Sequence, residues 1–241
     1  MTRPVLLDVE NQTAVITLNR PERRNAINQQ LLIRLYDALD AVTVRSDVRV
    51  IIITGNGPSF CAGLDLGAIG KENLFDARED GSDLPDLMRA CKKPIIAAVN
   101  GHAITGGFEL ALNCDFIIAA ENAQFSDTHA RVGIHPGWGM TQLLQQTVGQ
   151  RRAKQISFAC QPIYAHTALA WGLVNEVLPR DHLLDRAKTI AAQIVQADPQ
   201  LLGVIKTLIE NRNRSPLEQA FDQERSGFKQ FLRDQISKFK S

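Results

Sequence analysis

Short apolar runs that alternate with glycine-containing loops and helical segments constrain the fold of this 241-residue chain more than any other feature. The runs at 50–53, 94–99 and 115–120 are predicted to be buried strands, because they are short, continuous and apolar. Apolar helices are predicted over 108–112 and 141–148, each after a stretch that contains glycine. Strands that alternate with helices in this way indicate an α/β core.

Further elements surround this core. Residues 4–9 and 12–18 predict a hairpin of two paired strands. Apolar residues at helical spacing from Ile27 onward predict an amphipathic helix. Residues 70–85 are polar, acidic and glycine-bearing, which is typical of a mobile surface loop. From about Asp181 the pattern is entirely helical.

The predicted organisation is therefore a core over residues 1–190 and a C-terminal helical region over residues 191–241. The last helix carries Phe221, Phe228 and Phe231 among charged residues. A solvated helix rarely presents so much apolar surface. We therefore expect this helix to pack against another subunit.

The composition excludes several classes of protein. It is that of an ordinary globular chain, with 44% hydrophobic and 22% charged residues. A formal net charge of +1 predicts no field that would attract nucleic acid or an anionic membrane. No apolar stretch approaches the length of a membrane span, and the N-terminus shows no signal segment. The four cysteines form no C-x-x-C pair, so we expect reduced thiols in the cytoplasm and no metal site.

Two glycine-containing stretches are the candidates for chemistry. In the first, small residues at 59–63 precede a predicted helix start that Asp65 could cap, which alone is a weak signal. In the second, Gly106 and Gly107 enter a helix, where unpaired N–H groups favour an anion. Glu109 falls in the first turn of this apolar helix, so its carboxylate should be partly desolvated beside that anion. The alternative is a carboxylate that only complements the helix dipole.

Both stretches together resemble the crotonase, or enoyl-CoA hydratase and isomerase, superfamily over about residues 5–229. The matching segments are Leu-Asn-Arg-Pro at 18–21, Asn-Ala at 25–26, Ala-Gly-Leu-Asp-Leu at 62–66, Lys-Pro-Ile-Ile-Ala-Ala-Val-Asn-Gly at 93–101, Gly-Gly-Phe-Glu-Leu-Ala at 106–111, Cys-Asp at 114–115, Ala-Gln-Phe at 123–125 and Trp-Gly-Leu-Val at 171–174. The resemblance implies a crotonase-like spiral of ββα units with a C-terminal helical trimerisation region. It also implies a homotrimer, or a hexamer formed as a dimer of trimers.

The resemblance also implies a site in which the Leu64 and Gly106 amides polarise a thioester carbonyl and Glu109 moves protons. The acyl-CoA thioester is then a substrate, and neither a cofactor nor a metal is required. Binding of CoA and of the acyl chain is expected at residues that match the family pattern or lie beside it. These are Arg24, Ala26, Cys61, Ala62, Asp65, Leu66 and Trp138. A solvated arginine and a packed turn tryptophan are the alternatives for Arg24 and Trp138.

One position departs from the family pattern. Family hydratases carry a second glutamate shortly after the Ala-Gln-Phe segment, and this chain has His129 there. A neutral imidazole has a donor and an acceptor nitrogen, so His129 could substitute for that glutamate. It could equally be a loop histidine bonded to Asp127. Arg131 and His135 are weaker candidates, and Ser126 is a poor nucleophile candidate because triad members meet through tertiary geometry.

The sequence favours reversible hydration of a 2-enoyl-CoA by an enoyl-CoA hydratase-like lyase. Glu109 would activate water or protonate the α-carbon, and His129 would assist. Three alternatives remain open: double-bond isomerisation, decarboxylase or other lyase chemistry on a CoA enolate, and a non-catalytic acyl-CoA-binding relative. Loss of the conjugated enoyl-thioester absorbance would separate turnover from binding alone.

Overall fold

The computed structural model describes residues 3–239, and the side chains up to residue 233. The chain forms two compact units, the first ending at Gln196 and the second beginning at Ala197. The strands, all in the first unit, are β1 (Val5–Glu10), β2 (Thr13–Leu18), β3 (Val50–Gly55), β4 (Ser59–Cys61), β5 (Ile95–Val99), β6 (His102–Ile104), β7 (Phe116–Ala120), β8 (Gln124–Ser126), β9 (Ile163–Tyr164) and β10 (Glu176–Leu178). The helices of that unit are η1 (Pro21–Arg23), α1 (Gln29–Val44), α2 (Leu84–Ala90), α3 (Gly106–Leu112), α4 (His129–Val132), α5 (Met140–Val148), α6 (Gln150–Ala159), α7 (Ala165–Ala170) and α8 (Arg180–Val195).

A six-stranded sheet forms the centre of the first unit, in the order β1-β2-β3-β5-β7-β10. Strands β1 and β2 pair antiparallel through a tight turn in which Asn11 and Gln12 both have positive φ, which confirms the predicted hairpin. The remaining neighbours are parallel. Parallel strands need cover on both faces, which explains their continuous apolar sequence.

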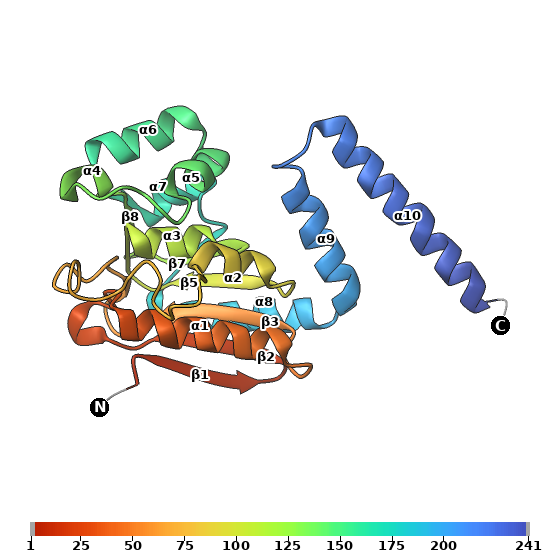
Figure 1. The fold of residues 1–241 in the computed structure, drawn as a ribbon, viewed down its shortest axis with the longest axis horizontal. Helices are drawn as coiled ribbons and strands as arrows, with labels where there is room; N and C mark the ends of the chain where they lie inside the picture. Colours follow the sequence, from red (N-terminus) through yellow and green to blue (C-terminus); the bar gives the residue numbers. More distant parts are fainter. Residues whose placement is uncertain (1–2, 240–241) are drawn as a thin grey trace. The chain divides into compact units, whose positions relative to one another are not determined.

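The two faces of this sheet have different cover. On one face, α8 packs through Leu183, Ala187 and Ala191 against side chains such as Ile52 and Ile96. The other face joins the larger core, which includes the apolar face of α1 and the buried residues of α3. Figure 1 shows α1 lying along the strands β2 and β3. The predicted α/β core is therefore confirmed.

A smaller sheet in the order β4-β6-β8-β9 gives the chain its spiral course. Each of the strands β3, β5 and β7 of the large sheet is followed by a strand of the small one, namely β4, β6 and β8. A helix then follows: α2, α3 or α4. This repeated ββα order confirms the predicted crotonase-like spiral. Because β4, β6 and β8 run parallel, the segments that follow them leave the small sheet at the same edge.

Two local predictions differ from the structure. The chain after Leu64 forms turns rather than a helix, and Asp65 instead accepts a hydrogen bond from the Gly67 N–H at 3.1 Å. The predicted surface loop over 70–85 is anchored by the buried side chains of Leu74 and Ala77, and α2 begins within it at Leu84. Its apolar residues are too widely spaced to show a periodic pattern, so the sequence did not reveal this anchoring.

The second unit contains α9 (Pro199–Asn211) and α10 (Leu217–Phe239). Asp198 caps α9, because its side chain accepts the Leu201 N–H. On α10, Phe221, Phe228 and Phe231 are about half exposed in the single chain, at 53%, 60% and 48%. The predicted helical C-terminal region is therefore present, and it displays apolar side chains to its surroundings.

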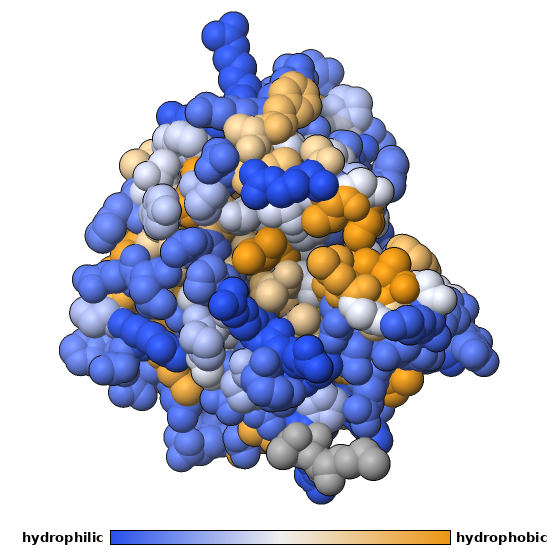
Figure 2. All heavy atoms as spheres, turned by 90° about the vertical axis from the view of Figure 1, so that its left-hand side faces the viewer, coloured by the Kyte–Doolittle hydropathy of each residue, from blue (hydrophilic) through white to orange (hydrophobic). Residues whose placement is uncertain are grey.

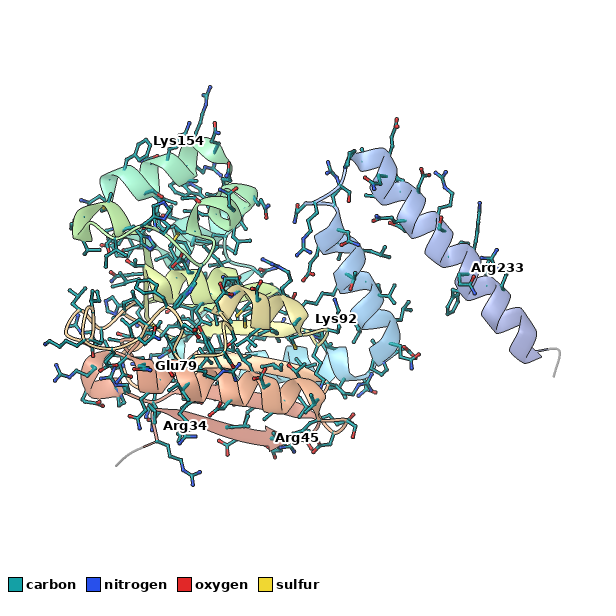
Figure 3. The ribbon with its side chains drawn as sticks, viewed as in Figure 1. Arg34, Arg45, Glu79, Lys92, Lys154 and Arg233 are labelled. Carbon is teal, nitrogen blue, oxygen red and sulfur yellow. The ribbon has the colours of Figure 1, made fainter. Side chains whose placement is uncertain are left out.

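Charged side chains lie on the periphery of the first unit, as Arg34, Arg45 and Lys154 illustrate (Figure 3). Each of these three residues is exposed: Arg34 lies in α1, Arg45 follows the end of that helix, and Lys154 lies in α6. Over the part of the chain that the structure describes, no helix is long and apolar enough to cross a membrane.

Candidate active site

One cavity of about 250 Å³ collects most of the candidate residues. Its lining is mainly apolar, with a few polar groups from three segments that follow β4, β6 and β8. The lining residues are Ala62, Leu64, Leu66, Leu74, Phe75, Asp83, Thr105, Gly106, Glu109, Thr128, His129, Val132, Ile134, His135, Gly137 and Trp138. Figure 2 looks onto the side of the molecule that carries α4, where apolar side chains gather between polar ones. An apolar cavity with a few converging polar groups is typical of a ligand site.

The Leu64 amide is turned toward the cavity by the backbone around it. Gly63 has φ 85°, and a Cβ there would lie 2.7 Å from the Ile104 carbonyl oxygen, so this position requires glycine. Ile27 pairs with the segment on either side of Leu64: its N–H donates to the Gly63 oxygen, and its oxygen accepts the Asp65 N–H, both at 2.8 Å. Leu64 itself therefore points its N–H away from Ile27. Among the residues that the structure describes, this N–H has no acceptor.

The Gly106 amide opens α3 beside the same backbone. Thr105 precedes it with a positive φ of 51° and ψ of −111°, a sparsely populated and strained conformation for a residue other than glycine. Its N–H is fixed on the Ser126 oxygen at 2.8 Å. Gly107 packs so tightly that a Cβ would lie 2.2 Å from the Cys61 oxygen. Within residues 3–239, the Gly106 N–H has no acceptor either, so two free donors border one cavity.

Glu109 lies in the first turn of α3 and is 2% exposed, as predicted for a desolvated carboxylate. Its Oε1 atom accepts the Trp138 N–H at 2.9 Å and the Met140 N–H at 3.2 Å. Burial raises the pKa of Glu109 above its ordinary value, although these two N–H groups and His129 act in the opposite direction. Because the backbone holds Oε1, Oε2 is the oxygen that remains for proton transfer.

His129 lies at the start of α4, directly across from Glu109. Its Nε2 atom is 3.6 Å from Glu109 Oε2, and its Nδ1 atom is 2.7 Å from Asp127 Oδ1. All three side chains are buried. The ring is thus bonded to Asp127, as one interpretation expected, and it also faces Glu109, so a part of His129 in catalysis stays a prediction.

Asp127 keeps its charge although it is only 1% exposed. Burial raises its pKa, but hydrogen bonds from the His129 ring and from the Ser157 hydroxyl outweigh that effect, so the net pKa is lowered. The His129 N–H adds a further bond to Oδ1 at 3.1 Å. In the described part of the chain, no hydrogen bond joins the Ser126 hydroxyl to His129, which argues against a nucleophilic triad.

The predicted binding residues divide into two groups. Ala62, Leu66 and Trp138 line the cavity, and the Trp138 ring covers Gly106, where a Cβ would lie 3.4 Å from the ring.

The other four residues lie outside the lining and shape the backbone around it. The Arg24 carbonyl accepts the Ala62 N–H at 3.0 Å, and the Arg24 side chain is exposed. The Ala26 carbonyl accepts a hydrogen bond from Arg20, which also pairs with Asp65 at 3.2 Å. Cys61 is fully buried.

A pair of threonines in the cavity wall has no signal in the sequence. The hydroxyls of Thr105 and Thr128 lie 2.5 Å apart, and the Thr128 N–H also donates to Thr105 Oγ1 at 3.2 Å. These bonds join the segment before Gly106 to the segment before His129. The contact depends on the pairing of β6 with β8, which no local pattern reveals. Across the described residues, no group of three or more His, Cys, Asp or Glu side chains is arranged to hold a metal ion.

The repeated ββα turns and the helical C-terminal region define an α/β spiral enzyme. A sequence model of the enoyl-CoA hydratase/isomerase family matches residues 8–240, and the chain belongs to this family.

The chain is similar to both hydratases and an isomerase. It is 38% identical to a crotonyl-CoA hydratase from Syntrophomonas wolfei, over 93% of this chain and 88% of that protein. A solved enoyl-CoA hydratase from Bacillus anthracis is 33% identical, with a TM-score of 0.86 over 94% of this chain and 90% of its own. A monofunctional enoyl-CoA isomerase from M. smegmatis is 31% identical, with a TM-score of 0.80 over 91% of this chain and 99% of its own.

Proposed function

We propose that this enzyme adds water across the 2,3 double bond of an enoyl-CoA thioester. The observation that carries the proposal is the convergence of two free N–H donors and a facing Glu109–His129 pair on one apolar cavity. Each part meets one requirement of the reaction. The donors stabilise an enolate oxygen, the pair handles two protons, and the apolar wall receives the acyl chain.

The thioester carbonyl oxygen would bind the N–H groups of Leu64 and Gly106. Attack on the β-carbon moves negative charge onto this oxygen, and donors that are already in place stabilise it, each by roughly 3 kcal/mol. The backbone supplies this interaction, so the leucine side chain contributes only to the cavity wall.

Protons would pass through Glu109 and His129. Their facing atoms are 3.6 Å apart, which is too long for a hydrogen bond between them. A water molecule roughly 2.8 Å from each atom would complete a triangle. One group accepts a proton from this water as its oxygen bonds to the β-carbon, and the other delivers a proton to the α-carbon. The net change is one new C–O bond and one new C–H bond, with one O–H bond of water and the π bond between C2 and C3 broken. A proton then passes between the two groups and restores their starting protonation states.

The CoA moiety would enter past the segment around Leu66, with Arg24 meeting its phosphates and Ala26, Cys61, Ala62 and Asp65 shaping its contact surface. The acyl chain would lie beside Trp138. Acyl-CoA is then the substrate, and the chemistry needs neither a metal nor a further cofactor. A cytoplasmic location stays a prediction from the isolated cysteines, all four of which are buried and outside any disulfide of the described residues.

We also propose that an oligomerisation region, predicted over residues 191–241 beyond a core of residues 1–190, begins after α8, because Ala191 in that helix packs against the sheet of the core. The exposed phenylalanines of α10 support this assignment, because such side chains are stabilised by a partner surface. A homotrimer or a dimer of trimers is expected. Light scattering on the eluted protein would measure the mass, and a monomer at micromolar concentration would contradict the assignment.

Incubation with crotonyl-CoA tests the proposed reaction. Hydration predicts loss of the conjugated thioester absorbance and a product heavier by one water molecule. Incubation with a 3-enoyl-CoA tests the isomerase alternative, because isomerisation would raise that absorbance without a change in mass. Binding of crotonyl-CoA without any product would show a non-catalytic acyl-CoA-binding protein, and release of CO2 from a carboxyacyl-CoA would show a decarboxylase.

A further inference from the structure

We propose that Asp127 is a positioning residue that fixes the tautomer and the orientation of the His129 ring. The proposal depends on the function proposed above at one point, namely that His129 takes part in proton transfer. The main evidence is that three buried side chains, those of Asp127, His129 and Glu109, lie in a row. Asp127 Oδ1 lies 2.7 Å from Nδ1 on one side of the ring, and Glu109 Oε2 lies 3.6 Å from Nε2 on the other.

The tautomer follows from the hydrogen-bonding capacity of a carboxylate. An ionised aspartate only accepts hydrogen bonds, so the Nδ1 atom at 2.7 Å must carry the proton. In the opposite tautomer, the Nδ1 lone pair would face the Asp127 oxygen within a buried site, and the two would repel each other. The neutral ring therefore has its proton on Nδ1 and a free lone pair on Nε2.

Asp127 is itself held in place, which gives it the rigidity that orientation requires. The His129 N–H donates to the same Oδ1 atom at 3.1 Å, and Ser157 of α6 interacts with the carboxylate and favours its charged form. The backbone after β8 thus fixes the carboxylate, and Nε2 of the ring faces Glu109 Oε2. This arrangement supplies a proton acceptor where family hydratases have a second carboxylate. The charged carboxylate also stabilises an imidazolium when Nε2 takes up a proton.

A purely structural role for Asp127 is the competing explanation, because its bond to the His129 N–H also stabilises the start of α4. A double-mutant cycle separates the two roles. Asp127→Asn keeps the shape of the side chain but can present an amide N–H to Nδ1, which favours the tautomer with its proton on Nε2. We expect it to lower kcat/KM for crotonyl-CoA by about 100-fold, the lower end of the usual contribution of acid–base catalysis. In a His129→Gln background, the same change should lower kcat/KM by less than about twofold, because there is no ring left to orient.

The exposed Asp185 on α8 gives a matched control, and Asp185→Asn should leave kcat/KM unchanged. An equal loss from Asp127→Asn in both backgrounds would show a structural role and overturn the proposal. Full activity of Asp127→Asn in the wild-type background would overturn it as well.

Nitrogen-15 NMR of histidine-labelled protein tests the tautomer without any turnover. The resonances of His129 are those that disappear in His129→Gln. At a pH where the ring is neutral, we expect the proton on Nδ1 in the wild type and a shift toward Nε2 in Asp127→Asn. A wild-type proton on Nε2 would overturn the proposal for Asp127. Wild-type hydration by His129→Gln would instead count against the proposed function of His129, so the two failures are distinguishable.

Discussion

The two walls of the cavity use different parts of the chain for their chemistry. On one wall, Leu64 and Gly106 offer main-chain donors, which glycines at 63 and 107 hold in place through contacts that leave no room for a Cβ. On the other wall, Glu109 and His129 use their side chains, and Asp127 supports the His129 ring from behind. The backbone wall should therefore tolerate a changed side chain at Leu64 but no added Cβ at Gly63 or Gly107. The side-chain wall should respond to isosteric changes that leave its shape intact.

The largest effect is expected from Glu109→Gln on the side-chain wall. The amide keeps the shape but cannot exchange a proton, so turnover of crotonyl-CoA should fall by about 10³- to 10⁴-fold. Binding of the substrate should stay within about threefold, because the main-chain donors are untouched. Stopped-flow absorbance and equilibrium binding measure the two quantities. Turnover at the wild-type rate would remove Glu109 from its assigned role.

His129→Ala should have the next largest effect. Removal of the imidazole takes away one of two proton-transfer groups, and turnover should fall by about 100-fold. The same absorbance assay measures the loss. Wild-type rates would reduce His129 to a structural partner of Asp127, and the side-chain wall would then act through Glu109 alone.

Gly107→Ala tests the backbone wall. The new Cβ would lie 2.2 Å from the Cys61 oxygen, and this atom belongs to the backbone and cannot swing away. We expect the free energy of unfolding to fall by about 3 kcal/mol, at the upper end for overpacking. Urea titration measures it. Gly67→Ala is the control, because its Cβ would meet only the tip of the Asp65 side chain, at 3.3 Å. Equal stability of the two variants would mean that the close approach at 107 is relieved by movement of the backbone.

The pH dependence of the free energy of unfolding tests the protonation of Glu109, a residue of the side-chain wall. Burial raises the pKa of Glu109 above 4.5, so the folded protein holds this proton more tightly than the unfolded chain does. The carboxyl therefore contributes stability below the unfolded pKa, and this contribution is lost as pH rises through the folded pKa. Glu109→Gln does not titrate, so its stability relative to the wild type should increase over that window. Urea titrations at several pH values test this, and a difference that stays constant with pH would contradict it.

Leu64→Ala should have the smallest effect among the five predictions made here for the two walls. The donor at this position is the main-chain N–H, which the substitution keeps, so turnover should change by about threefold or less, or about 0.7 kcal/mol of barrier. The crotonyl-CoA assay measures it. A loss as large as that of His129→Ala would show that the side chain, and not only the backbone, is needed at this wall.

Single residues of both walls could be predicted from the sequence, but the contact within the side-chain wall could not. Glycines that enter a helix before Glu109 are a local pattern, so the burial of this carboxylate and the free amide at Gly106 were predictable. The contact between Glu109 and His129 is not local. It arises because β6 and β8 pair in a register that sets Ile104 beside Ser126, so the segments after both strands reach the same edge. The fold followed from strand and helix periodicity together with the family resemblance.

Infrared difference spectroscopy of carbonyl-labelled crotonyl-CoA bound to Glu109→Gln tests the central claim most directly. This variant retains the donors at Leu64 and Gly106 but cannot complete the reaction. Two hydrogen bonds to the thioester oxygen weaken the carbonyl bond, so its stretching band should move to lower frequency than in free substrate. A bound substrate whose carbonyl band stays where it lies in water would contradict the proposed site.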